Sequence, residues 1–141
     1  MKKFFVAFLA VLALIGVSSA VLCAEEKADG KAIVYYFHGT FRCMTCMNME
    51  KYSREAIETN FKDALQSGKL EFNVLNVEEK GNEHFVKDYQ LYTKSLVLSF
   101  VKDGKEVKSK NLDKIWEYAH NKQEFVQYVA DEVRAFMKDA S

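Results

Sequence analysis

The chain contains no proline, one tryptophan and only three cysteines among its 141 residues. A cis peptide bond without proline costs about 2.5–4 kcal/mol, so we expect trans peptide bonds throughout. Three cysteines are too few for a small scaffold held together by several disulfides. A net charge of zero argues against binding nucleic acid through a broad basic surface, so no nucleic-acid partner is predicted. The chain does have 49% hydrophobic and 28% charged residues, which is typical of one globular domain.

Residues 1–24 have the pattern of a secretory signal peptide. Two lysines precede an apolar run at 4–17, which ends in the small residues 18–20. The run is shorter than the roughly 20 apolar residues of a spanning helix. We therefore expect cleavage after Ala20 or Ala24 and a periplasmic or secreted protein.

The third cysteine, Cys23, raises the alternative of a lipoprotein, because a lipidated cysteine would anchor the chain to a membrane. A lipobox has leucine three residues before the cysteine and a small residue just before it, whereas Ala20 and Leu22 stand there. Membrane attachment is therefore not expected unless Cys23 is lipidated. The remaining residues, 25–141, form one predicted domain, and export would place its two cysteines in an oxidising compartment.

Hydrophobic periodicity in this domain predicts alternating strands and helices. The expected elements are a strand at 32–38, a helix from 44 to about 66, a strand at 70–77, a short helix at 81–89, a strand at 95–101, a strand at 105–110, and terminal helices from 112 onward with a break near 119–120. The order β-α-β-α-β-β-α predicts an α/β fold with a mixed four-stranded sheet. The first two crossovers have helical length and predict parallel pairing, and Asp103-Gly104 predicts an antiparallel hairpin.

Cys43-Met44-Thr45-Cys46 lies between the first strand and the first helix. Free N–H groups and the positive dipole end at a helix start favour a thiolate, and Arg42 adds a neighbouring cation. We therefore expect a redox-active disulfide with Cys43 as nucleophile and Cys46 as resolving thiol. An inert structural disulfide is the alternative. His38, at the strand end, is either a proton donor to the leaving thiolate or a polar residue bonded to the backbone.

The same cysteines are also candidate ligands for a soft metal or metalloid, Cu(I) or As(III), together with Met44 and Met47. Alternatively, Met47 and Met49 simply face the core. Zinc is not expected, because no second pair of ligands completes a four-ligand site. The sequence has no glycine-rich dinucleotide motif and no phosphate-binding loop, so no cofactor is predicted.

The element order and the CxxC position resemble the thioredoxin superfamily over roughly residues 31–137. More narrowly, the segments YYFHGTFRCMTC, YTKS and NLDKIW resemble a bacterial group described as the nitrophenyl compound nitroreductase subunit ArsF family. The resemblance implies a thioredoxin-like βαβαββα sandwich. It also implies thiol–disulfide exchange or electron delivery to an envelope protein partner, with an accessory role in nitroaromatic reduction. Any flavin would come from another subunit.

Three positions depart from the thioredoxin pattern. The cis-proline that faces the CxxC in thioredoxins corresponds to Lys94 or Ser95, which the resemblance places in the groove facing Cys43, where Lys94 adds positive charge. Tyr35 or Tyr36 occupies the region of the buried acid, and Arg42 replaces the tryptophan before the first cysteine. Membership of the superfamily is therefore better supported than thioredoxin activity itself.

Overall fold

The computed structural model of the protein describes residues 30–140. The predicted signal peptide and Cys23 lie outside the described residues. The elements are β1 (Lys31–His38), α1 (Met44–Asn60), α2 (Lys62–Gln66), β2 (Leu70–Asn76), α3 (His84–Asp88), β3 (Ser95–Lys102), β4 (Lys105–Asn111), a 3-10 turn η1 (Asp113–Ile115) and α4 (Lys122–Ala140).

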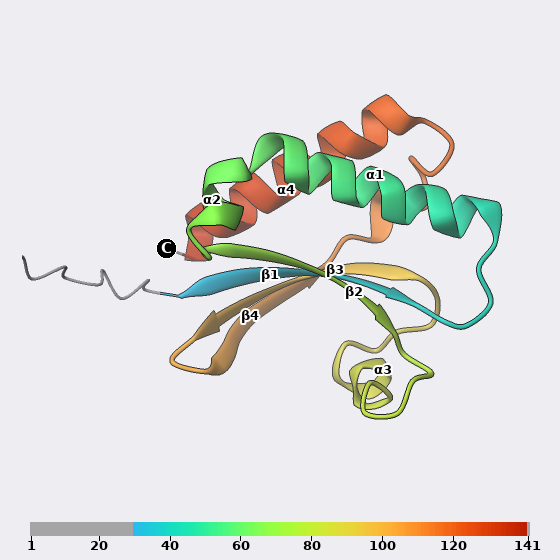
Figure 1. Cartoon of the computed structure of the whole chain (residues 1–141), viewed down its shortest axis with the longest axis horizontal. Coiled ribbons are helices and arrows are strands. Elements are labelled where there is room, and N and C mark those ends of the chain that lie inside the picture. Colours follow the sequence, from blue (N-terminus) through green and yellow to red (C-terminus); the bar gives the residue numbers. More distant parts are fainter. Residues whose placement is uncertain (1–29, 141) are drawn as a thin grey trace, which may run out of the picture.

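The four strands form one mixed sheet in the order β2-β1-β3-β4. β1 pairs parallel with β2 and antiparallel with β3, and β3 pairs antiparallel with β4. Helices α1 and α4 cover one face of the sheet, and α3 lies against the other (Figure 1). This is the predicted thioredoxin-like α/β fold, and the mixed four-stranded sheet is confirmed.

The main hydrophobic core lies between the sheet and the pair α1 and α4. It buries these large side chains, among others: Val34, Tyr36, Met49, Ile57, Leu96, Leu98, Leu112, Ile115, Phe125, Val129, Val133 and Phe136. A smaller cluster on the α3 side contains Phe37, Leu91 and Val97, with Tyr35 and Phe85 packed against them. Both faces of β1 are therefore covered, which fixes the strand that leads to the cysteines. Within residues 30–140, no helix has both the length and the hydropathy needed to cross a bilayer.

The parallel pairing predicted for the second crossover is wrong, because β3 runs antiparallel to β1. β2 ends at Asn76, which pairs with His38, and β3 begins at Ser95, which pairs with Phe37. The connection through α3 thus starts and finishes at the same end of the strands, the end at which β1 finishes. Because the chain does not cross back to the other end before β3 begins, β3 has to run in the direction opposite to β1 and β2.

The long helix predicted from 44 to about 66 is interrupted at Phe61, whose φ of −131° and ψ of 34° are not helical. The Asn60 side chain donates a hydrogen bond to the Ala56 carbonyl at 2.8 Å. Such local side-chain bonds compete with helical backbone bonding and favour a helix end. The segment therefore forms α1 and a separate short α2. The predicted helix at 81–89 is likewise shorter, with regular α-helix only in α3.

The predicted hairpin between β3 and β4 is confirmed, with Asp103 at φ 52° and Gly104 at φ 75° in the turn. β4 is an edge strand, and all seven of its residues are exposed. A register shift sits near Phe100 and Val101, opposite Val107. On either side of it, Glu106 accepts hydrogen bonds from Tyr89 and Ser99, whereas Lys108 and Lys110 form ion pairs with acids of α4. The bulge therefore directs Glu106 and Lys108 to opposite faces of the sheet.

Candidate active site

Cys43 and Cys46 form a disulfide with their Cα atoms 5.1 Å apart. Cys43 is the N-cap of α1, and its Sγ accepts a hydrogen bond from the Cys46 backbone N–H at 3.2 Å. Cys43 is partly exposed, whereas Cys46 is only 2% exposed. Solvent and partners can therefore reach the first sulfur, and the second lies behind it in the first turn.

The local sequence places Cys43 where a helix offers positive potential. β1 ends at His38, a turn follows, and Cys43 has the extended conformation of an N-cap, with φ −79° and ψ 165°. The first turn of α1 contains no acidic residue that would offset the dipole. An anionic sulfur at position 43 would therefore be stabilised by the helix end and by a direct N–H donor.

The turn before Cys43 is held by the last residue of β2 and by a residue that follows this strand. The Glu78 carboxylate accepts a hydrogen bond from the Thr40 backbone N–H at 3.1 Å, and the Asn76 side chain donates to the Thr40 hydroxyl at 3.2 Å. Hydrogen bonds from Thr40 lower the pKa of Glu78. A Cβ on Gly39 would lie 2.6 Å from Glu78 Oε1, so glycine lets the carboxylate approach closely. Glu78 was not anticipated from the sequence, because 38 residues separate it from Thr40.

Tyr36, and not Tyr35, lies beneath the disulfide. Its side chain is fully buried, and its hydroxyl donates a hydrogen bond to the Cys46 carbonyl at 2.7 Å. Burial raises the pKa of Tyr36, the nearby Arg42 charge opposes that change, and Glu50 adds to it. The phenol therefore stays protonated and serves as a donor that ties β1 to the first turn of α1.

Arg42 does not simply place a positive charge beside Cys43, as the sequence analysis expected. Its guanidinium forms an ion pair with Glu50, on the first half of α1, and both side chains are mostly buried. Arg42 Nε is buried and has no hydrogen-bond partner among the described residues. Glu50 also lies 3.7 Å from the Arg54 guanidinium. The sequence analysis missed Glu50, although its i+4 position after Cys46 places it on the same face of the helix.

The other predicted site residues lie at the end of the sheet where β1 finishes and β3 begins, close to the turn that precedes Cys43. His38 and Lys94 line a cleft of about 260 Å³. The His38 Nδ1 lies 2.8 Å from the Gly39 carbonyl, which places its proton on that nitrogen. This hydrogen bond matches the second of the two interpretations of His38, a polar residue at the strand end that is bonded to the backbone. Ser95 is buried, and its hydroxyl donates to the Thr93 carbonyl at 2.9 Å.

Trp116 fixes the loop that precedes β3, although nothing in the sequence analysis assigned it a role. Its indole N–H donates to the Lys94 carbonyl at 3.1 Å, across 22 residues of sequence. No cis peptide bond occurs within residues 30–140, as expected from the absence of proline. A tryptophan hydrogen bond thus holds the loop that precedes β3.

Two of the candidate metal-binding methionines are exposed. Met44 is 68% and Met47 43% exposed, whereas Met49 is fully buried. Met47 therefore does not face the core, so that alternative is wrong for Met47. It is confirmed for Met49, which does face the core. The part of the chain that the structure describes has no group of three or more His, Cys, Asp or Glu able to hold a metal ion. Any soft-metal site would depend on the two cysteines with thioethers.

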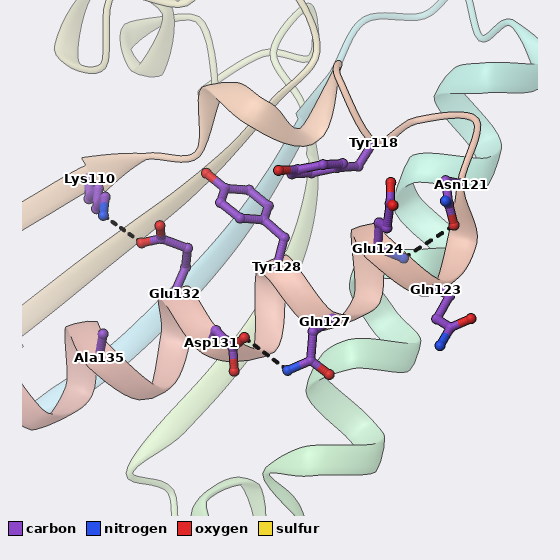
Figure 2. Close-up of a pocket in the computed structure, with 10 residues that line it drawn as sticks. All are labelled: Lys110, Tyr118, Asn121, Gln123, Glu124, Gln127, Tyr128, Asp131, Glu132 and Ala135. Atoms are coloured by element: carbon purple, nitrogen blue, oxygen red, sulfur yellow. Dashed lines mark hydrogen bonds and ion pairs between the residues drawn. The ribbon is translucent and has the colours of Figure 1, made fainter.

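A wide, open cavity of about 910 Å³ lies elsewhere, over α4 and the end of β4. Figure 2 shows Tyr118 and Tyr128 in it with their rings adjacent, beside the ion pair of Lys110 with Glu132. None of the predicted site residues lines this cavity.

Comparisons with known proteins find similarity only at a low level. No family model matches the chain. No curated protein matches it as a relative either. Among solved structures, thioredoxin from Fasciola hepatica is 20% identical with a TM-score of 0.45, covering 81% of this chain and 85% of that chain. Thioredoxin O2 from Arabidopsis thaliana in the oxidized state is 14% identical, with a TM-score of 0.40, and the alignment covers 67% of this chain and 76% of that chain. The thioredoxin-like fold itself is assigned from the strand order, the strand directions and the position of the CxxC pair.

Proposed function

We propose that the protein is a thiol–disulfide oxidoreductase that exchanges electrons with a protein partner through Cys43 and Cys46. One observation carries the proposal: a partly exposed sulfur caps a helix and accepts an N–H bond, and its disulfide partner is buried directly behind it. This arrangement stabilises a leaving or attacking thiolate at Cys43 and reserves Cys46 for the second step.

The chemistry balances without a cofactor. In the reducing direction the Cys43 thiolate attacks a partner disulfide, one partner sulfur leaves as a thiolate, and a mixed disulfide forms. The Cys46 thiolate then attacks Cys43 Sγ, which closes the intramolecular disulfide and releases the second partner sulfur. Two electrons pass to the partner, and two protons move from the cysteine thiols to the partner thiols. The oxidising direction is the reverse.

A protein partner is supported by the surface around the pair. Apolar side chains close to the cysteines in the sequence are exposed, namely Phe41, Met44 and Met47. Tyr92 is 94% exposed on the loop that shares a cleft with His38 and Gly39. Exposed aromatic and methionine side chains are typical of protein contact surfaces. We propose an envelope protein as the partner, with export directed by residues 1–24.

The finer assignment, an accessory subunit of the nitrophenyl compound nitroreductase type, is part of the same proposal. It rests on the three sequence segments that resemble that family. In that role the protein would deliver electrons as thiols, and the nitro-reducing cofactor would belong to the partner.

A Cys46→Ser variant tests the exchange function. Without the resolving thiol, Cys43 should remain joined to its partner in a mixed disulfide that survives non-reducing electrophoresis and disappears with dithiothreitol. A Cys43→Ser variant is the matched control and should trap nothing, because Cys46 is buried. Equal trapping by both variants, or by neither, would contradict the assigned roles.

Binding of Cu(I) is a second candidate function, favoured by the exposed thioethers of Met44 and Met47. Reduced Cys43 and Cys46 would supply two thiolates, and a soft thioether would complete the coordination. Competition with a chromophoric Cu(I) chelator measures the affinity of the reduced protein. Met47→Leu and Met44→Leu preserve size and remove sulfur, so each should weaken binding if its thioether is a ligand. Unchanged affinity in both variants would remove the methionines from the site.

A further inference from the structure

The turn between β1 and α1 is not held by its own backbone. Residues 39–42 lie outside every helix and strand, and within the part of the chain that the structure describes no backbone–backbone hydrogen bond involves them. Burial contributes little, because Thr40 and Phe41 are exposed. Cys43 follows this turn and has the N-cap conformation in which its sulfur receives an N–H bond. Side-chain contacts therefore have to fix the turn for Cys43 to keep that conformation.

Two residues at the end of β2 bind the first half of this turn. β1 and β2 are parallel, so the loops that follow them leave the sheet at the same end (Figure 1). The Asn76 amide donates to the Thr40 hydroxyl, and its oxygen accepts the Glu78 backbone N–H at 3.0 Å. The Glu78 carboxylate accepts the Thr40 backbone N–H at 3.1 Å. The second half of the turn is held separately, by the ion pair of Arg42 with Glu50.

Gly39 makes room for the carboxylate of Glu78. A Cβ at position 39 would lie 2.6 Å from Glu78 Oε1, closer than such atoms approach in proteins. Gly39 is not among the glycines with a positive φ, so its backbone conformation alone does not require glycine. The absence of a side chain matters here because it admits the acid that binds the next residue.

Glu78 has two effects on a thiolate at position 43, and they have opposite signs. Its negative charge opposes a second anion nearby, and its removal would leave the positive charge of Lys94, which acts on Glu78, without that acid. Its bond to Thr40 works the other way. A fixed turn keeps the Cys43 sulfur at the N-terminus of α1, where a thiolate is stabilised.

We propose that Glu78 is a positioning residue for Cys43, an inference that rests on the proposed exchange function. By binding Thr40, Glu78 holds the turn in the conformation that places Cys43 Sγ against the first N–H groups of α1. The Cys43 thiolate then attacks the partner disulfide, forms the mixed disulfide and releases one partner sulfur as a thiolate. Glu78 takes no proton and forms no bond to the reacting sulfurs. It acts on this first step through the backbone of the turn.

The two steps of exchange can be separated with 5,5′-dithiobis(2-nitrobenzoate), because each attack releases one coloured thiolate. In a Cys23→Ser background of the full chain, Cys43 of the reduced protein gives the first release as it forms a mixed disulfide. Cys46 gives the second release when it attacks Cys43 Sγ and closes the intramolecular disulfide. Stopped-flow absorbance measures the first rate from about pH 5 to pH 9, and the pH of half-maximal rate reports the ionisation of Cys43.

Glu78→Ala should slow the first release at pH 7 about two- to fivefold, the range that corresponds to losing one interaction with a helix N-terminus. The pH of half-maximal rate should rise. Glu78→Gln keeps an oxygen that accepts the Thr40 N–H, so its first release should stay closer to that of the wild type. Glu79→Ala is the matched control, because Glu79 is exposed and its side chain has no hydrogen bond or ion pair among residues 30–140. It should leave the first rate unchanged.

Gly39→Ala is an independent route to the same effect, since its methyl group would displace the Glu78 carboxylate from Thr40. If both residues act through one contact, the double variant of Gly39→Ala with Glu78→Ala should be no slower than the slower single variant. Independent effects would instead multiply. Circular dichroism checks that each variant is folded.

A faster first release in Glu78→Ala would show that the charge of the acid outweighs its hold on the turn, and would overturn the proposal. An unchanged first rate in either folded single variant, or effects that multiply in the double variant, would overturn it as well. A wild-type protein that gives no second release would instead refute the exchange function itself.

Discussion

Reduction of the Cys43–Cys46 disulfide should lower the free energy of unfolding by no more than about 2 kcal/mol. The two cysteines are three residues apart, so their bond closes a very short loop. For a loop of about four residues the chain-entropy relation gives roughly 6 cal/mol/K, or about 2 kcal/mol at 25 °C. A thiolate bonded at the helix N-terminus in the reduced protein recovers about 0.3–1 kcal/mol of this. The core between the sheet, α1 and α4 lies outside the loop and remains intact.

Urea unfolding followed by far-ultraviolet circular dichroism, with and without a phosphine reductant, measures the difference. With slopes of about 1–3 kcal/mol/M, the urea midpoint should fall by no more than about 2 M, with the slope unchanged. A double variant, Cys43→Ser with Cys46→Ser, should match the reduced protein and ignore the reductant. Complete unfolding on reduction, or a loss above about 4 kcal/mol, would show a structural staple and refute the reasoning.

Three further predictions concern the surroundings of the pair. Tyr36→Phe should destabilise the oxidised protein by about 1 kcal/mol in urea unfolding, because it removes one buried hydrogen bond to the Cys46 carbonyl; no change would mean that the bond contributes nothing. The pKa of Glu71 is lowered by hydrogen bonds from the first lysine of β1 and from a neighbouring asparagine. The stability that this lowered pKa provides is fully present above the unfolded pKa of about 4.3, and it is lost as the pH falls through the lower pKa of the folded protein. Glu71→Gln should therefore flatten the acid side of a plot of unfolding free energy against pH. The change should be less than about 1 kcal/mol, because the ion pair of Lys31 with Glu71 is exposed. Trp116→Phe should increase amide hydrogen exchange around Lys94 with little loss of global stability, because it frees one loop carbonyl; unchanged exchange would mean that the loop is held elsewhere.

Much of the fold can be predicted from the sequence, since β1 and β3 are nearly continuous apolar runs and the hairpin turn contains a strong signal. Asp103-Gly104 adopts the two positive φ angles that favour Asp and Gly at a hairpin turn, and this pair fixed the position of β4 correctly. The direction of β3 could not be predicted in the same way. It depends on the end of the sheet at which the α3 connection finishes, and that is set by tertiary packing and not by any local sequence signal. The break at Phe61 also escaped notice, because it involves one side-chain bond from Asn60.

The candidate site was predictable where adjacent residues determine it and unpredictable where distant ones do. Cys43 and Cys46 occupy the strand-to-helix position that their spacing indicates. The environment of Arg42 was not predictable, because its partner Glu50 stands eight residues later and is brought back by the turn before α1. The same limit applies to Trp116, because the whole β3–β4 hairpin separates it from Lys94 in the sequence.

The bulge in β4 has a consequence for the behaviour of the protein at high concentration. An exposed edge strand offers free backbone groups to a second copy, and flat edges of this kind promote aggregation. Here the register shift beside Val107 interrupts the edge, and Lys105, Lys108 and Lys110 punctuate it. Two such strands brought together would mismatch their backbone bonds and bury ammonium groups. The irregular β4 edge should therefore reduce aggregation. Light scattering from concentrated solutions should detect no dimer in which two copies pair their β4 strands.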